Sequence, residues 1–375
     1  MIVIHVITGL GLGGAEQMLC KLLEYRSSNV IDPYVVSLTN DIPLGNRLRE
    51  AQIPVDCLGM EPGRITAAGL TKLFRILKSS NPSVVQTWLY HSDLLGGIIA
   101  KLAGVPHVIW NIRNTNLDAD KIRWQTRQTV SLCSLLSNHL PSKIICNSRI
   151  SAREHQNRGY SAVPFRIIPN GFDVELFKTQ QDSKLHLRKK LSLPIHGTLV
   201  GHVARFDPVK NHKGLLRAFA HIVRENNSVY LLCCGPGVTA ENRILTEQMK
   251  ELGISHRVFL LGPREDTVDL MNVMDLMVLP SHGEAFPNVV GEAMACEVPC
   301  MVTDVGDCAE IVGKTGWIVQ PGDEEALVES LLYAIGSSKE HRQEKGRAAR
   351  QRITENYRIQ DIVQKYEDLY LSLET

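Results

Sequence analysis

Short apolar runs alternate along the first half of the chain with longer stretches whose apolar residues recur every three or four positions. The short runs are rich in β-branched residues and lie at 2–8, 35–38, 84–87, 108–110, 143–146 and 165–168. The longer stretches include 15–25, 44–51, 65–79 and 92–102. The first pattern predicts strands and the second predicts helices. Regular alternation of the two is typical of a parallel sheet covered by helices.

The alternation starts again near residue 198, after a turn-rich Pro-Asn-Gly-Phe-Asp segment at 169–173. Strands are predicted at 199–204, 229–234, 258–261, 276–280, 300–303 and 316–319, and helices at 213–225, 240–252, 266–274, 324–336 and 340–355. At 375 residues the chain is longer than a usual single domain. We therefore predict two α/β domains, at 1–172 and 173–355.

The last stretch, 356–375, predicts one more helix. Apolar side chains gather on one face of it, at Ile362, Val363, Tyr366, Leu369 and Tyr370. A helix with one apolar face must bury that face against another element. The pattern by itself does not say which domain receives it.

Composition places the chain among ordinary globular proteins, with 44% hydrophobic and 22% charged residues. The net charge is +1, which gives no general indication of nucleic-acid binding. Residues 1–172 carry 18 Lys and Arg against 11 Asp and Glu, whereas the remainder carries 23 against 29. A basic first half suits an anionic lipid surface or a diphosphate-bearing acceptor, and an uneven solvated surface explains it equally well.

Nine cysteines occur without a C-x-x-C pair or zinc-type spacing. They read as small core residues of a protein in a reducing compartment. The N-terminus lacks the features of a signal peptide, and no apolar run reaches about 18 residues. We expect a cytoplasmic protein, either soluble or attached to the inner face of the cell membrane.

The segment 281–295 combines a loop that contains Gly and Pro with the start of a helix, directly after the apolar run at 276–280. Glu284 lies in the loop and Glu292 in the helix, with the spacing E-x7-E. Free backbone N–H groups and the positive end of the helix dipole suit a phosphate there. A carboxylate beside a phosphate suits the hydroxyls of a sugar or ribose. A nucleotide-sugar has both kinds of group.

Two cations follow the first strand of the second series. Arg205 and Lys210 flank a Pro turn, and converging cations suit a diphosphate. Fixed cations also stabilise the negative charge that develops on a leaving nucleoside diphosphate. An exposed Arg and Lys on a loop are often merely solvated, but their place beside the E-x7-E segment favours the diphosphate.

The glycine-rich loop at 9–14 matches G-x-G-x-x-G between a strand and a helix. This context keeps open an NAD-dependent oxidoreductase, although the nearest acidic residue for a ribose, Asp41, comes somewhat late. The alternatives are a backbone that approaches a sugar or diphosphate, and a tight turn without a ligand.

Three further features carry weaker indications. Asp118 and Asp120 form a D-x-D pattern, which we interpret as a helix N-cap and not as a metal site. The helix predicted at 124–140 suits either a membrane surface or core packing. His91, Asp93 and Arg113 follow strands, where ligands bind in parallel sheets.

These motifs together resemble the family-4 retaining glycosyltransferases. The resemblance rests on Gly-Gly-Ala-Glu at 13–16, Ile-Pro-Asn-Gly-Phe-Asp at 168–173, the 205–210 segment and the E-x7-E segment with its flanks, in this order along nearly the whole chain. It implies the GT-B fold, in which two Rossmann-like domains face each other and the C-terminal helix crosses back to the N-terminal domain. It also implies that no metal or other cofactor is needed.

The resemblance also implies roles for particular residues. Arg205 and Lys210 would bind the donor diphosphate, Glu284 would contact the donor sugar and Glu292 would hold the ribose hydroxyls. The backbone N–H groups of Asn288 and Val289 would support the sugar or phosphate. From the first domain, Gly13 and Gly14 would close over the diphosphate.

Two departures from the family pattern stand out. A histidine that is common after the strand at 108–110 is replaced by Arg113, which we take as its substitute in substrate binding. The usual Glu-Phe-Gly is here Glu284-Ala285-Phe286, which keeps the acid and moves the aromatic by one position. Phe286 is therefore a further candidate for contact with the donor sugar.

The sequence thus predicts a retaining glycosyltransferase. It would move a hexose or N-acetylhexosamine from a nucleoside diphosphate, more readily uridine than guanosine, to a saccharide acceptor. We expect a polyprenyl-diphosphate-linked acceptor in the synthesis of a bacterial surface polysaccharide. The alternatives are a nucleotide-sugar epimerase or hydrolase of the same fold, the oxidoreductase, and a sugar-binding regulator without activity.

Overall fold

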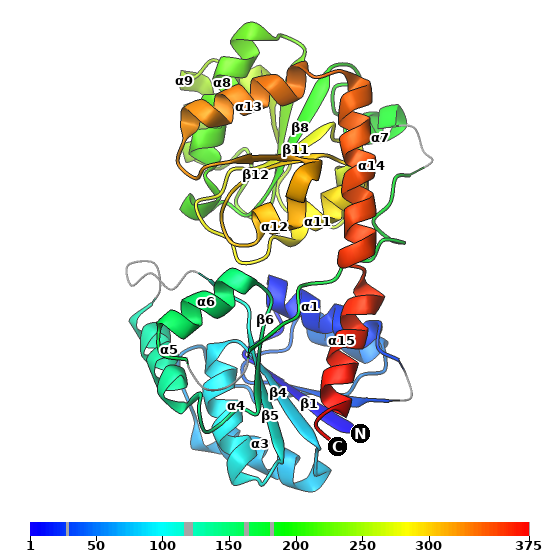
Figure 1. Ribbon diagram of the computed structural model, residues 1–375. Coiled ribbons are helices and arrows are strands. Elements are labelled where there is room, and N and C mark those ends of the chain that lie inside the picture. The colour runs from blue at the N-terminus through cyan, green and yellow to red at the C-terminus, as the bar shows by residue number, and fades with distance from the viewer. Residues whose placement is uncertain (28–29, 116–122, 161–164, 181–183, 375) are drawn as a thin grey trace. The chain divides into compact units, whose positions relative to one another are not determined.

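The structure is a computed structural model that describes residues 1–27, 30–115, 123–160, 165–180 and 184–374. The chain folds into two compact units, Met1–Gly171 with Ile359–Thr375 as unit 1 and Phe172–Arg358 as unit 2. Each is a parallel sheet with helices on both faces (Figure 1).

Unit 1 is built on a seven-stranded parallel sheet with the order β3-β2-β1-β4-β5-β6-β7. The strands are β1 (Ile2–Ile7), β2 (Asp32–Ser37), β3 (Val55–Cys57), β4 (Val84–Trp88), β5 (His107–Ile112), β6 (Lys143–Cys146) and β7 (Phe165–Ile167). The central strands are buried on both faces, which explains why they read as continuous apolar runs.

Two layers of helices cover this sheet. One core contains side chains of α1 (Gly14–Glu24), α2 (Leu44–Glu50) and α15 (Ile359–Leu371). The other contains side chains of α3 (Ala67–Ser80), α4 (Tyr90–Leu102), α5 (Trp124–Leu136) and α6 (Arg149–Asn157). The C-terminal helix α15 thus belongs to unit 1, where it contacts α1. Its predicted apolar face is the buried one.

Unit 2 repeats the plan with six parallel strands in the order β10-β9-β8-β11-β12-β13. They are β8 (Thr198–Val203), β9 (Val229–Cys234), β10 (Val258–Leu260), β11 (Leu276–Leu279), β12 (Cys300–Thr303) and β13 (Trp317–Val319). One core involves α7 (Lys184–Lys190), α10 (Thr267–Val273), α11 (Asn288–Ala295), α12 (Cys308–Val312) and α14 (Lys339–Asn356). The other involves α8 (His212–Glu225), α9 (Arg243–Glu251) and α13 (Glu324–Gly336).

The strand order reverses direction once in each sheet, between β1 and β4 in unit 1 and between β8 and β11 in unit 2. Open parallel sheets bind ligands outside the carboxyl ends of the strands at such a switch point. The glycine loop follows β1, the Arg205 segment follows β8 and the Glu284 segment follows β11. The sequence motifs therefore lie where the topology favours a ligand.

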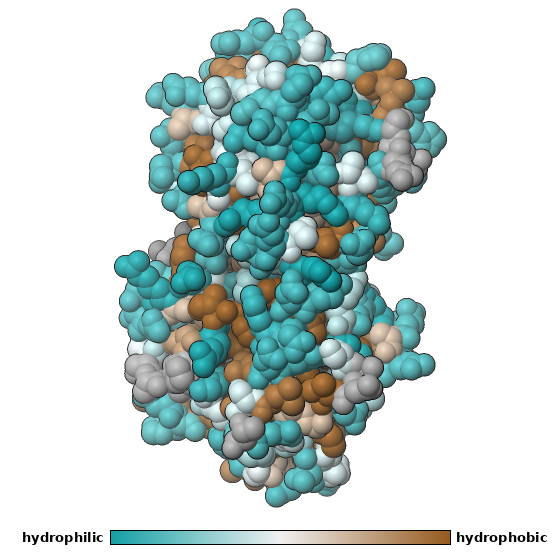
Figure 2. Space-filling view, turned by 45° about the vertical axis from the view of Figure 1, so that its right-hand side comes forward, coloured by the Kyte–Doolittle hydropathy of each residue, from teal (hydrophilic) through white to brown (hydrophobic). Residues whose placement is uncertain are grey.

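No helix of the described residues is long and apolar enough to cross a membrane. The space-filling view shows one face with mostly polar side chains and scattered apolar ones (Figure 2).

Candidate active site

The loops after β8 and β11 are fastened to each other at the switch point of unit 2. The backbone N–H of His282 donates to the carbonyl of Val209 at 2.7 Å. Thr303, at the end of β12, donates its hydroxyl to the carbonyl of Ser281 at 2.6 Å. The first bond joins the two motif loops directly, and the second fixes the loop after β11 to β12.

Lys210 and Glu284 meet at this point. The Lys210 Nζ lies 2.6 Å from Glu284 Oε1, and the two side chains are only 16% and 8% exposed. The same Oε1 accepts a hydrogen bond from the Ser281 hydroxyl at 2.7 Å. The Lys210 ammonium and the Glu284 carboxylate are both largely shielded from water. The pair places a group that can bind phosphate next to a group that can bind hydroxyls.

Arg205 lies on the same loop but has a different partner. Its guanidinium pairs with Asp207, with 2.9 Å between Nη2 and Oδ2, and its side chain is 63% exposed. Asp207 also caps the short 3₁₀ helix Pro208–Lys210 by accepting from the backbone N–H of Val209. Burial opposes ionisation of Asp207, but this hydrogen bond and the Arg205 charge lower its pKa overall. The predicted pair of cations is therefore held through two different carboxylates.

Two buried histidines lie beneath this loop. The rings of His202 in β8 and His212 at the start of α8 are 4.5 Å apart, and Nδ1 of His202 hydrogen-bonds the carbonyl of Val278 at 2.9 Å. Burial lowers their pKa values to about 3 and about 4, so both are neutral near pH 7. Sequence reasoning missed them, although His212 lies on the apolar face of a strongly amphipathic helix.

The Glu284 segment is also fixed from its other side. The carbonyl of Ala285 accepts from the backbone N–H of Asp307 at 3.0 Å. Gly306 has φ of +54°, and a Cβ there would lie 2.3 Å from the Glu284 carbonyl oxygen. A glycine is therefore required for this close approach, and no motif had indicated it.

Phe286 turns away from the loop into the core. Its ring is 7% exposed, stacks on Phe172 with 6.1 Å between centroids and meets the edge of Tyr357 at 5.8 Å. Helix α11 begins two residues later, and its N-cap, Pro287, makes no side-chain capping hydrogen bond. The predicted contributors Asn288, Val289 and Glu292 lie in its first two turns and are half-buried.

In unit 1 the glycine loop ends at the start of α1, with Gly13 as the N-cap and Gly14 as the first residue. A Cβ on Gly13 would lie 2.3 Å from a carboxylate oxygen of Glu16, which therefore folds back over the helix start. Burial raises the pKa of Glu16, and a backbone hydrogen bond opposes the shift. Asp41, the acid that an oxidoreductase would need for ribose, is paired with Arg49.

Arg113 follows β5 and lies among buried groups of unit 1. It donates to the Tyr366 hydroxyl of α15 at 2.5 Å and to the Asn170 side chain, and it lies 4.8 Å from the centre of the Trp88 ring. Burial lowers its pKa, and the nearby Tyr366 opposes the shift. Arg113 thus joins the C-terminal helix to the sheet. Its predicted contact with substrate stays a prediction.

Two other candidates lie at the start of α4. Its N-cap, Leu89, has φ of +73°, a strained conformation of the kind that gathers at functional sites. Burial lowers the pKa of His91, whereas burial raises that of Asp93 to about 7. The D-x-D pair, Asp118 and Asp120, lies outside the described residues.

All nine cysteines are free thiols. No group of three or more His, Cys, Asp or Glu among the described residues is arranged to hold a metal ion.

Two Rossmann-like units, each with a predicted ligand-binding motif at its switch point, are the plan of the GT-B fold. Residues 12–176 match the family model described as Glycosyltransferase Family 4, and residues 197–337 match the one described as Glycosyl transferases group 1. The chain belongs to this family of glycosyltransferases, and the predicted family and fold class are confirmed.

Relatives from several bacteria are similar to this chain. N-acetyl-alpha-D-glucosaminyl L-malate synthase of Bacillus anthracis is 33% identical over 186 residues, which cover 49% of this chain and 48% of the relative. UDP-Gal:alpha-D-GlcNAc-diphosphoundecaprenol alpha-1,3-galactosyltransferase of Escherichia coli is 24% identical over 313 residues, which cover 81% and 79%. The crystal structure of HepE from Anabaena in complex with UDP is similar over 99% of this chain and 100% of that one, with TM-score 0.87 and 22% identity.

Proposed function

We propose that this glycosyltransferase moves a hexose or N-acetylhexosamine from a UDP-sugar to a saccharide acceptor, with retention of configuration at the anomeric carbon. The observation that carries the proposal is the contact between Lys210 and Glu284 at the switch point of unit 2. It places a cation for the diphosphate beside a carboxylate for the sugar hydroxyls.

The site residues divide between the two ends of the donor. Arg205 and Lys210 bind the diphosphate, and their charge stabilises the leaving UDP as the glycosidic bond breaks. Glu284 accepts hydrogen bonds from the sugar, and Glu292 from the ribose. When a donor binds, the Lys210 ammonium exchanges part of its contact with Glu284 for a phosphate oxygen.

The remaining predicted contacts support this arrangement. We propose that the backbone N–H groups of Asn288 and Val289, at the positive end of α11, face the sugar or phosphate. Phe286 acts from the core by fixing the loop that carries Glu284. In unit 1, Gly13 and Gly14 offer backbone to the diphosphate, and Arg113 contributes to substrate binding.

The choice of UDP rests on the relatives. HepE of Anabaena has been crystallised with UDP and with UDP-glucose, and the relative from Escherichia coli is named for UDP-Gal. The sugar is left as a hexose or N-acetylhexosamine because the departure from the family pattern falls at Ala285 and Phe286, beside the expected sugar position.

We further propose a polyprenyl-diphosphate-linked acceptor and peripheral contact with the inner face of the cell membrane, in the synthesis of a surface polysaccharide. The relative from Escherichia coli is named for such an acceptor. In α5, Trp124, Leu132 and Leu135 are 66%, 48% and 70% exposed, which suits insertion into a lipid interface.

Retention fits attack by the acceptor hydroxyl on the face that the UDP leaves. The acceptor oxygen bonds to the anomeric carbon, the bond from that carbon to the phosphate oxygen breaks, and the acceptor proton passes to the departing phosphate. The residues assigned above provide charge and orientation, and the reaction needs no covalent intermediate with the chain.

The decisive experiment incubates the protein with a panel of UDP- and GDP-sugars, with and without a polyprenyl-diphosphate-linked saccharide. We expect UDP release that depends on the acceptor, and an NMR spectrum of the product with the anomeric configuration of the donor. Complete conversion of the donor without acceptor would instead identify an epimerase or hydrolase. Inversion in the product would refute the proposed stereochemistry.

A further inference from the structure

A polar cavity lies at the amino ends of the central strands β8 and β11 of unit 2. Its volume is about 470 Å³, within the range of small-molecule sites. Thr198, the first residue of β8, and Asp275, just before β11, line it, whereas Arg205 and Glu284 follow the carboxyl ends of these strands. Because β8 has six residues, the cavity and the donor motifs lie roughly 20 Å apart along the strand.

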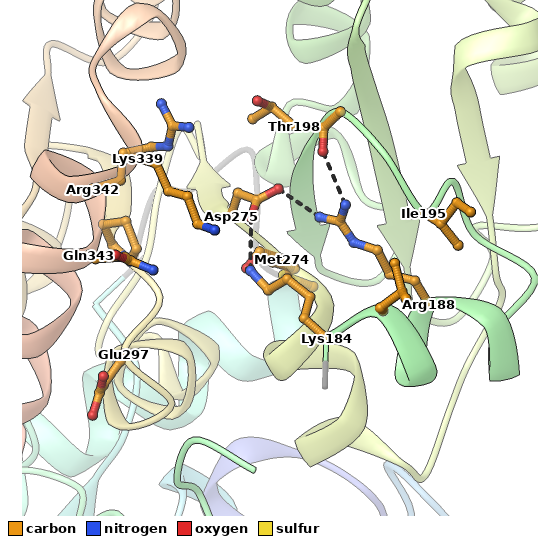
Figure 3. A pocket seen from close by; sticks show the side chains of 13 residues that line it. Lys184, Arg188, Ile195, Thr198, Met274, Asp275, Glu297, Lys339, Arg342 and Gln343 are labelled. Atoms are coloured by element: carbon orange, nitrogen blue, oxygen red, sulfur yellow. Dashed lines mark hydrogen bonds and ion pairs between the residues drawn. The ribbon is translucent and has the colours of Figure 1, made fainter. Parts of the chain in front are cut away.

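Positive charge dominates the walls of this cavity (Figure 3). Lys184, Arg188, Lys339 and Arg342 line it, against the two carboxylates of Asp275 and Glu297. At neutral pH the lining side chains carry four positive and two negative charges. Such an excess of cations around a concave surface attracts an anion.

Two of these cations, Arg188 and Arg342, make hydrogen bonds that stabilise the fold. Arg188 is almost fully buried, donates to the carbonyl of Val273 and pairs with Asp275, with 2.6 Å between Nη2 and Oδ2. Arg342 donates to carbonyls at the end of α13. These two side chains form fixed walls, so we do not assign them to ligand binding.

The two lysines differ in their partners. The Lys184 ammonium shares the Asp275 carboxylate with Arg188, at 2.8 Å from Oδ1, and also donates to the carbonyl of Met274. Lys339 is exposed, and no hydrogen bond or ion pair joins its ammonium to another residue in the described ranges. Figure 3 shows its side chain reaching into the cavity toward Asp275 and Lys184.

Lys184, Arg188 and Lys339 carry more positive charge than Asp275 neutralises. Burial lowers the pKa of Lys184, and the charges of Arg188 and Lys339 add to that shift although Asp275 opposes it. Lys339 is also the first residue of the 18-residue helix α14, so the positive end of this helix dipole faces the same cavity. One more anion would relieve the repulsion among these groups.

We propose that this cavity binds a phosphate group, with Lys339 as the recognising side chain and Lys184 beside it, at a site separate from the donor site. Either a free phosphorylated molecule or the headgroup of a lipid supplies the same chemistry. Binding at the base of β8 and β11 gives unit 2 a place where an anion acts without competing with the nucleotide-sugar.

The test uses the full chain saturated with UDP, so that the donor cations are occupied. Pyrophosphate is titrated at constant ionic strength while the melting temperature is recorded. The variant is Lys339→Glu. The matched control is Arg347→Glu, an exposed cation on the same helix that lies outside the cavity, roughly 12 Å along the axis. An acidic residue suits the first turn of a helix, so Lys339→Glu is expected to fold.

We expect pyrophosphate to raise the melting temperature of the wild type and of Arg347→Glu, and Lys339→Glu to need at least about tenfold more pyrophosphate for the same rise. A second arm measures sedimentation with vesicles of phosphatidylglycerol. Loss of vesicle binding in Lys339→Glu alone, with weak pyrophosphate binding, would identify the lipid headgroup as the source. If neither probe distinguishes Lys339→Glu from Arg347→Glu, the proposed site is refuted.

Discussion

The contact between Lys210 and Glu284 makes a prediction that separates stability from catalysis. We consider Lys210→Met and Glu284→Gln, singly and together. Each single change leaves one charged group of a largely buried pair without its partner, whereas the double variant removes both charges. The two side chains are 16% and 8% exposed, so solvent compensates only part of the loss.

Removing one partner of a buried ion pair costs about 3–5 kcal/mol. Because this pair keeps some contact with water, we expect about 2–3 kcal/mol for each single variant. The Ser281 hydroxyl continues to bond the amide of Glu284→Gln, which places that variant at the lower end. The double variant leaves no uncompensated charge, so we expect a coupling free energy of about 1–2 kcal/mol in the double-mutant cycle.

We expect the same variants to affect kcat/KM differently from the free energy of unfolding. If Lys210 stabilises the leaving diphosphate and Glu284 orients the sugar, each single variant lowers kcat/KM by about 10² or more. The double variant recovers stability without recovering activity, because both contacts with the donor are gone. Urea unfolding gives the stabilities, and UDP release with the preferred donor gives the rates.

A surface pair provides the control. Lys190 and Asp269 have the same N–O distance, 2.6 Å, but the lysine is 56% exposed. Lys190→Met is expected to cost less than about 1 kcal/mol and to leave kcat/KM unchanged. If the effects of the two single changes on the free energy of unfolding add up to the effect of the double change, the buried pair does not form in solution. Near-normal rates in Lys210→Met or Glu284→Gln would remove the site assignment.

Three further predictions concern the scaffold. Gly291→Ala would place a Cβ 2.1 Å from the Phe172 ring and should cost about 1–3 kcal/mol or more in urea unfolding, whereas Gly336→Ala, with open space around it, should not destabilise. The pKa of Asp93 is about 7 in the folded protein against 3.8 unfolded, so its contribution to stability is lost as the pH rises between these values. The free energy of unfolding of Asp93→Asn, measured relative to wild type, should therefore rise by about 3 kcal/mol from pH 5 to pH 8. A difference in the free energy of unfolding that does not change with pH would refute this. Arg113→Gln should lower the melting temperature, because it loses the hydrogen bonds to α15 and to the loop after β7; an unchanged melting temperature would show that those bonds are not needed.

The larger elements were predictable because their signals are local. Buried parallel strands read as apolar runs, and helices such as α1, α3, α8 and α9 bury one apolar face. The misses have physical reasons. Strand β3 has three residues and lies at a sheet edge, and α6 contains few apolar residues, although Ser148 caps it. The polar α7 was missed for the same reason.

The segments proposed to bind the donor were predictable as strand, loop and helix start, and the topology places them at the switch point. Their contacts were not predictable, since Lys210 and Glu284 are 74 positions apart and their meeting depends on the pairing of β8 with β11. The requirement for Gly306 and the buried pair of His202 and His212 also arise only from that packing.

The displaced aromatic of the Glu-Ala-Phe segment shows how the core sets the site. Because Phe286 lies one position later than in the family pattern, its ring stacks on Phe172, which itself fits against α11 only because residue 291 has no side chain. The backbone between Glu284 and α11 is thus anchored at both ends, by this stack and by the bond from Asp307 to Ala285. The small Ala285 side chain then stands in the half-exposed position of the loop. If Glu284 contacts the donor sugar as proposed, this core contact fixes the carboxylate, and the small side chain at position 285 sets how much room a sugar has beside it.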